Sequence, residues 1–442
     1  MKQTMNETKP SGWQRRTILF LTSQCITLFG STLVQMAVVW YATMETASGA
    51  WVAAFTVCSY LPQFLISFSG GVWADRYSRK LLIAGADALT ALATLAMLLA
   101  VPHITSKPLF LGGLLLMSVI RSLGAGIQTP AVNAVIPQLV PEEHLMRCNG
   151  INAAMQSAVQ FAAPAAAGAI FAVSTLDTTL MIDIVTAILG IGLLSCLSIP
   201  SCKSQGQCSS FIQDMKAGVN YAFSHRTIGR LLILYGLFTF LCVPAGFLAG
   251  LFVRRSFGDT YWYLTAVEVI GFGGMILGGI LMSLKNNGQS KTRLLSWGLF
   301  SFGAFAIGMG LSAYFIPYLI MMFFYGIALT VVQTSITTLI QEHTDVSMQG
   351  RVFGLLGTMY SGFLPLGMAL FGPMADAFPL SWIMVGSGGA LILMGLYSKL
   401  LFYVLMADIK MCGNFSDTYI QGRITLELTL PGFSISIRRN TM

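Results

Sequence analysis

The sequence predicts an all-α membrane protein whose twelve transmembrane helices form two pseudo-symmetric bundles of six. Three observations predict this fold class. Of the 442 residues, 55% are hydrophobic and 10% are charged, whereas a soluble domain carries about 25% charged residues. The apolar residues gather in twelve runs, each long enough to cross a bilayer as a helix, which takes roughly 20 residues. The longest polar break, residues 200–226, falls after the sixth run.

The predicted spans divide the chain into five parts. These are a cytoplasmic N-terminus (1–17), an N-terminal bundle (18–199), a cytoplasmic linker (200–227), a C-terminal bundle (228–406) and a cytoplasmic tail (407–442). The tail is expected to be disordered, although residues 424–430 alternate like a β-strand. The twelve spans are 18–43, 51–74, 81–101, 109–127, 150–173, 179–199, 228–253, 261–284, 294–313, 317–340, 352–375 and 380–406.

Lysine and arginine are distributed unevenly between the predicted loops. If the N-terminus is cytoplasmic, the inner segments before Lys410 hold sixteen of these cations. The outer loops hold three, namely Lys107, Arg254 and Arg255. This asymmetry predicts that both termini are cytoplasmic. It also accounts for the formal charge of +8 without a nucleic-acid partner.

Short motifs recur at matching places in the two halves. A parallel repeat of six spans predicts a substrate site between the halves, near the middle of the membrane. The matching pairs are Gly70-Gly71 with Gly278-Gly279, Gln128-Thr129 with Gln333-Thr334, and Pro164 and Gly168 with Pro365 and Gly367.

The loop between the second and third spans is short and basic. Its residues Gly71, Asp75, Arg76, Arg79 and Lys80 resemble in order and spacing the signature between helices 2 and 3 of major facilitator superfamily transporters. The glycine allows close helix packing, and the carboxylate can sit at the positive end of a neighbouring helix. The resemblance implies a conformational-switch loop. The alternative is a loop that only fixes the topology.

Three ionisable residues inside spans are candidates for proton coupling or substrate contact. Arg121 lies about 16 Å into the fourth span at 1.5 Å per residue. A cation at this depth normally faces the bundle interior with a partner. Asp183 and Glu268 lie in different halves, and a carboxyl group removed from water can exchange a proton near neutral pH. The alternatives are a static ion pair and carboxylates that stay hydrated. Asp87, in the third span, is expected to pair with the basic loop.

Weaker candidates are uncharged. Gln35, Gln63 and Asn133 are polar groups that could line a cavity. Pro164 and Gly168 resemble a weak form of the antiporter motif of drug exporters, in which proline frees a backbone carbonyl and glycine lets helices approach. An ordinary packing face is the alternative.

The sequence carries no signature of an enzyme. Its four histidines fall in loops or at span ends, and its eight cysteines show no paired metal spacing. Motifs of serine hydrolases, zinc proteases and nucleotide-binding loops are absent. We therefore expect no enzymatic activity, no cofactor and no metal.

Stretches from the first to the eleventh span resemble the macrolide-efflux branch of bacterial drug exporters. The resemblance implies a monomeric bacterial plasma-membrane protein that exports small hydrophobic drugs in exchange for protons. It leaves open assistance by a separate ATP-binding protein. Two rival functions are a facilitator of another small metabolite and a non-transporting membrane sensor. The resembling stretches are 35–37, 85–87, 120–122, 129–135, 139–143 and 350–353, and residues 121–126 also resemble the fourth-span arginine motif of sugar and drug transporters.

Overall fold

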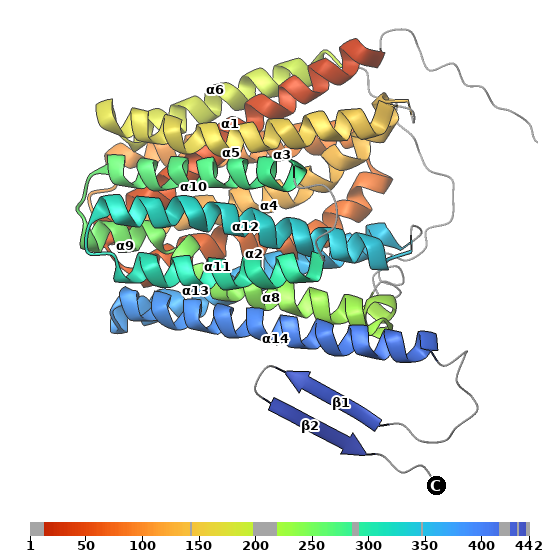
Figure 1. The fold of residues 1–442 in the computed structure, drawn as a ribbon. Coiled ribbons are helices and arrows are strands. Elements are labelled where there is room, and N and C mark those ends of the chain that lie inside the picture. Colours follow the sequence, from red (N-terminus) through yellow and green to blue (C-terminus); the bar gives the residue numbers. More distant parts are fainter. Residues whose placement is uncertain are drawn as a thin grey trace, which may run out of the picture.

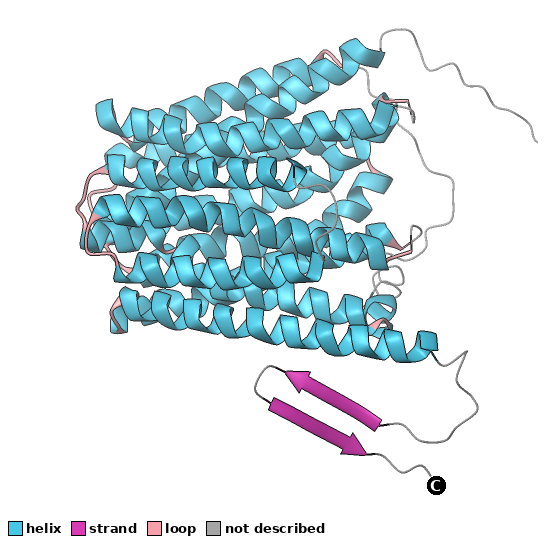
Figure 2. Ribbon diagram, viewed as in Figure 1, coloured by secondary structure: helices cyan, strands magenta, loops and turns pink. Residues whose placement is uncertain are grey.

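A computed structural model describes residues 13–141, 144–197, 219–284, 291–345, 348–414, 425–430 and 433–438 of the chain. In this part of the chain, twelve helical segments are long and apolar enough to span a membrane. The helices lie side by side along one common direction (Figure 1), and short loops join them at both ends (Figure 2). The predicted fold class is therefore confirmed.

The N-terminal half contains six long helices. Each corresponds to one predicted span, and several extend beyond it. The helices are α1 (Trp13–Thr46), α2 (Gly49–Arg76), α3 (Arg79–Ala100), α4 (Lys107–Leu139), α5 (Leu145–Val173) and α6 (Leu176–Ser195), with a short 3₁₀ turn, η1 (Val101–His103), after α3.

Helix α4 runs twelve residues beyond the end predicted for the fourth span, which was residue 127. The prediction stopped at Gln128, Thr129 and Pro130 because polar residues and proline usually end a span. The helix continues through Pro130 because the residues after it bury apolar side chains in a core cluster, among them Ala131 and Val135. Packing therefore compensates for the backbone hydrogen bond that the proline cannot donate.

The C-terminal half repeats the pattern with one interruption. The seventh span divides into α8 and α9 because Pro244 lies in the last turn of α8, and the N–H groups of Phe247 and Leu248 then share the carbonyl of Val243. The helices are α8 (Arg226–Gly246), α9 (Ala249–Ser256), α10 (Tyr261–Leu284), α11 (Lys291–Leu311), α12 (Phe315–His343), α13 (Gln349–Ala377) and α14 (Leu380–Asn414).

Part of the tail is helix and strand, and its expected disorder stays a prediction. Helix α14 continues to Asn414, and β1 (Thr425–Leu430) pairs antiparallel with β2 (Phe433–Arg438). The register places Leu426 opposite Ile437 and Leu428 opposite Ile435.

Equivalent helices pack alike in the two halves. α2 packs on α4 as α10 packs on α12, and both pairs approach closely through glycines. A Cβ atom on Gly126 would lie 2.7 Å from the carbonyl oxygen of Gln63, and one on Gly326 would lie 2.2 Å from that of Gly271. Small residues let membrane helices make this approach. Between the halves, α2 packs on α13 and α5 packs on α10.

The helices end at two opposite ends of the bundle. We call the end that holds Trp13, Ser195 and Arg226 the linker end, and the opposite end, which holds Lys107 and Asp376, the far end. The far end lies to the left in Figure 1, where α9 is labelled.

Candidate functional site

A buried ion pair joins α4 to α6. The side chains of Arg121 and Asp183 are 9% and 6% exposed. The guanidinium donates from Nη1 to Oδ2 of Asp183 and from Nη2 to Oδ1, the second at 3.2 Å. Arginine suits this two-pronged geometry because its N–H groups match the spacing of the carboxylate oxygens. Of the two predicted acids, Asp183 is the one that balances Arg121.

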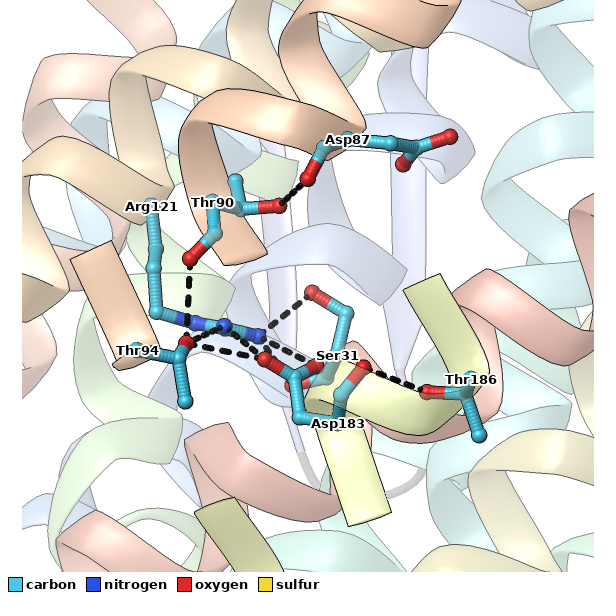
Figure 3. Close-up of polar contacts among 7 residues, drawn as sticks. All are labelled: Ser31, Asp87, Thr90, Thr94, Arg121, Asp183 and Thr186. Carbon is cyan, nitrogen blue, oxygen red and sulfur yellow. Dashed lines mark hydrogen bonds and ion pairs between the residues drawn. The ribbon is translucent and has the colours of Figure 1, made fainter. Parts of the chain in front are cut away.

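Two hydroxyl groups complete the surroundings of the pair (Figure 3). Arg121 donates to the Thr94 hydroxyl on α3 at 2.6 Å and to the Ser31 hydroxyl on α1 at 3.0 Å. The Thr94 hydroxyl lies 2.9 Å from Asp183 Oδ2, to which it can donate. Four helices thus converge on one saturated polar cluster. Removing one charge from such a buried pair costs about 3–5 kcal/mol, because the other is left uncompensated.

Asp87 does not pair with the basic loop, which corrects the expectation from the sequence. It is 5% exposed and accepts a hydrogen bond from Gln128 Nε2 at 2.8 Å. Lys80 donates instead to the carbonyls of Ser195 and Leu197, at 2.8 and 2.6 Å. Carbonyl groups at the end of α6 attract a cation because they lack partners within their helix.

The basic loop therefore fastens neighbouring helices at the linker end. Arg79 donates from Nε to the Ala74 carbonyl of α2 at 3.0 Å and from Nη1 to the Ala134 carbonyl of α4 at 2.7 Å. The side chains of Asp75 and Arg76 and the surroundings of Gly71 lie outside the described part, so the switch role of this loop stays a prediction.

Glu268 lies on α10 at the boundary between the halves. It is half-buried, and no ion pair to it is found among the described residues. Tyr60 of α2 lies within electrostatic reach of Glu268 and forms a side-chain hydrogen bond with Gln35 of α1. The structure thus brings Glu268 and Gln35 together but keeps Asp183 inside the N-terminal bundle.

The other two uncharged candidates lie elsewhere. Gln63 donates its backbone N–H to the Ser122 hydroxyl at 2.8 Å, inside the contact between α2 and α4. Asn133 lies exposed on α4, two turns before the linker end of that helix.

The Pro164–Gly168 stretch of α5 belongs to the contact between the halves. Both residues are buried, and a Cβ atom on Gly168 would lie 1.8 Å from Oγ1 of Thr265 on α10. One turn further, the rings of Phe171 and Tyr261 stack at 4.3 Å. Close packing is thus the geometric reason for glycine at this position.

A polar cluster that the sequence reasoning missed ties the halves together at the far end. Asp376, at the end of α13, caps α2 of the other half by accepting from the N–H groups of Gly49 and Ala50, at 2.7 and 2.9 Å. It also accepts from the Ser48 hydroxyl at 2.8 Å and from Arg255 Nη2 at 2.6 Å.

Arg255 extends this cluster to the backbone before α2. It donates from Nε to the Ala47 carbonyl at 2.9 Å and from Nη1 to the Ala375 carbonyl. Ala47 has φ of 48°, a left-handed conformation that costs an L-residue about 1–2 kcal/mol. We call these residues, Ala47–Ala50 with Arg255 and Asp376, the far-end latch. A usable signal exists in the sequence, since Arg255 is one of three cations in the loops predicted to be outer.

Comparison with known proteins agrees with this architecture. Residues 20–368 match the Major Facilitator Superfamily. The chain belongs to this superfamily. A crystal structure of the nucleoside transporter NupG, 14% identical, superposes with a TM-score of 0.69 over 89% of this chain and 100% of that one. This superfamily fold, with transporters as relatives, identifies a transporter rather than an enzyme.

Two relatives of this superfamily member carry a more specific name. Macrolide efflux protein A from Streptococcus pyogenes is 28% identical over 407 residues, which is 91% of this chain and 100% of the relative. The protein of the same name from Enterococcus faecalis is 29% identical over 324 residues, which is 72% of this chain and 99% of the relative. The twelve spans and these bacterial relatives indicate a multi-pass bacterial membrane protein.

Proposed function

We propose that this protein exports hydrophobic drugs, macrolide antibiotics in particular, in exchange for protons by alternating access. The observation that carries the choice of cargo is the likeness to Macrolide efflux protein A, which extends over 91% of this chain and the whole length of that relative. A resemblance confined to the superfamily fold would support transport but no class of cargo.

The far-end latch supports alternating access. It holds the two halves together at one end of the bundle through Asp376 and Arg255. The excess of lysine and arginine in the inner loops assigns the linker end to the cytoplasm and the far end to the outside. On this assignment the conformation is closed to the outside. A latch that exists in one access state biases the equilibrium between states.

The orientation has its own test. A cysteine placed at Lys107 should react with a membrane-impermeant thiol reagent added outside intact cells, and one placed at Lys203 should react only after permeabilisation. The reverse pattern would overturn the orientation.

Glu268, Tyr60 and Gln35 are our candidates for cargo contact. They come from α10, α2 and α1 and lie where the two halves meet. A half-buried carboxylate without a cationic neighbour can pair with the amine of a cationic drug, and the tyrosine ring offers it a π-face. The saturated Arg121–Asp183 pair is our candidate for the charge that proton movement acts on.

A drug-susceptibility panel tests the proposal. In an efflux-deficient host, the protein should raise the inhibitory concentration of macrolides, and a proton uncoupler should abolish this protection. Glu268→Gln should weaken protection against cationic drugs more than against neutral ones, at equal membrane abundance. Arg293→Gln, which removes a charge from the exposed start of α11, serves as the control.

Other outcomes would favour the rivals. Unchanged drug accumulation together with flux of another small metabolite would favour a facilitator of that metabolite. Absence of any proton-coupled flux in proteoliposomes would favour a membrane sensor.

A further inference from the structure

A second carboxyl group, Asp87, lies buried on α3 near the Arg121–Asp183 pair. Its Oδ1 accepts the hydrogen bond from Gln128, but its Oδ2 is buried and has no hydrogen-bond partner. An ionised carboxylate with an unsatisfied oxygen is costly in an apolar interior because the charge has lost its water. A protonated carboxyl group tolerates this place better because it carries no net charge.

The charges around Asp87 do not balance if it is ionised. The charged groups that act on it are Arg121 of α4 and Asp183 of α6. On its own helix, Arg79 and Lys80 donate to carbonyls at the linker end. The described side chains of α2 include no aspartate, glutamate, lysine, arginine or histidine, and its titratable groups are the thiol of Cys58 and the phenol of Tyr60. One guanidinium and two carboxylates would leave a net charge of −1 buried, which favours uptake of one proton.

Asp183 is poorly placed to take that proton. Both of its oxygens accept from Arg121, so its neutralisation would leave a buried guanidinium uncompensated. We propose that Asp87 is the proton-binding carboxyl group of the N-terminal bundle. This proposal rests on the proposed exchange of drug for protons. In each cycle the carboxyl O–H bond breaks to give a proton to water on the cytoplasmic side, and a proton from outside re-forms it.

The position of Asp87 suits this role. It lies eight residues from the start of α3, about 12 Å along the helix, so water entering at the linker end meets it before Arg121. Asp87, Thr90 and Thr94 share one face of α3, and Thr90 donates to the Asp87 carbonyl at 2.9 Å. Figure 3 shows this row leading from Asp87 to the ion pair. The carboxyl group of Asp87 also lies within electrostatic reach of Arg121 and Asp183, so a change of charge at Asp87 acts on the pair that holds α4 to α6.

Infrared difference spectroscopy of the purified protein in nanodiscs tests the proton site without any drug. Raising the pH should remove a carboxylic-acid C=O band from the wild-type spectrum, and ¹³C-labelled aspartate should shift that band. Asp87→Asn should lose the band, whereas Asp177→Asn, which alters the first turn of α6 at the far end, should keep it. A wild-type band that aspartate labelling does not shift, or an unchanged band in Asp87→Asn, would overturn the proposal.

Flux measurements separate this proposal from the proposed function. In proteoliposomes, Asp87→Asn should lose macrolide transport driven by an imposed pH gradient and keep drug–drug exchange without a gradient. Gradient-driven flux at the wild-type rate in Asp87→Asn would refute the proton site. If the wild type itself moves no macrolide, export is refuted, and the infrared result alone decides the role of Asp87.

Discussion

Substitution of Asp376 should open the far end of the molecule. Asp376→Ala removes the cap on the first turn of α2, a loss that costs typically about 1 kcal/mol. It also removes the ion pair with Arg255, whose two side chains are 31% and 32% exposed. Because water screens a pair this exposed, we assign it only about 0.5 kcal/mol. The sum of about 1.5 kcal/mol corresponds to a roughly tenfold shift toward states open at the far end.

Asp376→Asn should act more weakly. Asparagine caps helices nearly as well as aspartate, so the main loss is the charge that faces Arg255. We expect a shift of about twofold from the loss of about 0.5 kcal/mol. The difference between the two variants distinguishes capping from ion pairing, and the double variant with Arg255→Gln measures the coupling between the two residues.

Pulsed electron paramagnetic resonance can measure this shift. Spin labels at Lys107 and Asp259, which are exposed at the far end in opposite halves, report the distance between the halves in a cysteine-free background. The long-distance population should grow in Asp376→Ala and stay unchanged in Asp177→Ala, which has no part in the latch. Identical distance distributions for Asp376→Ala and the wild type would refute the latch as a determinant of the access state.

Three further substitutions test other contacts. Gly168→Ala should slow transport because its Cβ would overlap Thr265, an overpacking that costs about 1–3 kcal/mol. Thr265→Ala should restore transport to the Gly168→Ala variant. If flux assays show no such rescue, the contact does not limit transport. Asp183→Asn should lower the melting temperature because the folded state loses about 3–5 kcal/mol of stability. The double variant Arg121→Met with Asp183→Leu should recover part of that stability. An unchanged melting temperature in Asp183→Asn would mean that the ion pair is hydrated. Asp75→Asn should insert normally but impair efflux, and normal efflux at normal abundance would reduce the basic loop to a topology signal.

The sequence predicted the need for a partner to Arg121 but could not choose it. A cation at that depth requires a counter-charge from another helix, because its own span holds no acid. Two acids were candidates, and the choice depends on which faces of α4 and α6 meet. Side chains from four helices decide that packing, so it cannot be inferred from the local sequence of α4 and α6.

The wrong partner predicted for Asp87 and the failure to predict the far-end latch have a common cause. Nearness in sequence predicts that Asp87 pairs with the basic loop, yet seven residues of helix, about 10 Å, separate it from Lys80. The far-end latch joins Ser48 to Asp376, which lie 328 positions apart. Contacts of this kind arise from how the halves meet, and local patterns record little of that. Span positions were predictable because hydrophobicity depends on the residue and not on its neighbours in space.

The close contact between Gly49 and Gly372 has a mechanical consequence. A Cβ atom on Gly49 would lie 2.2 Å from the Gly372 carbonyl, so the two backbones nearly touch at the far end of α2 and α13. A helix of 28 residues such as α2 is about 42 Å long. If α2 tilts by roughly 10° about the glycine contact near one of its ends, its other end moves by about 7 Å. A small rotation at the far end would thus become a wide displacement at the linker end.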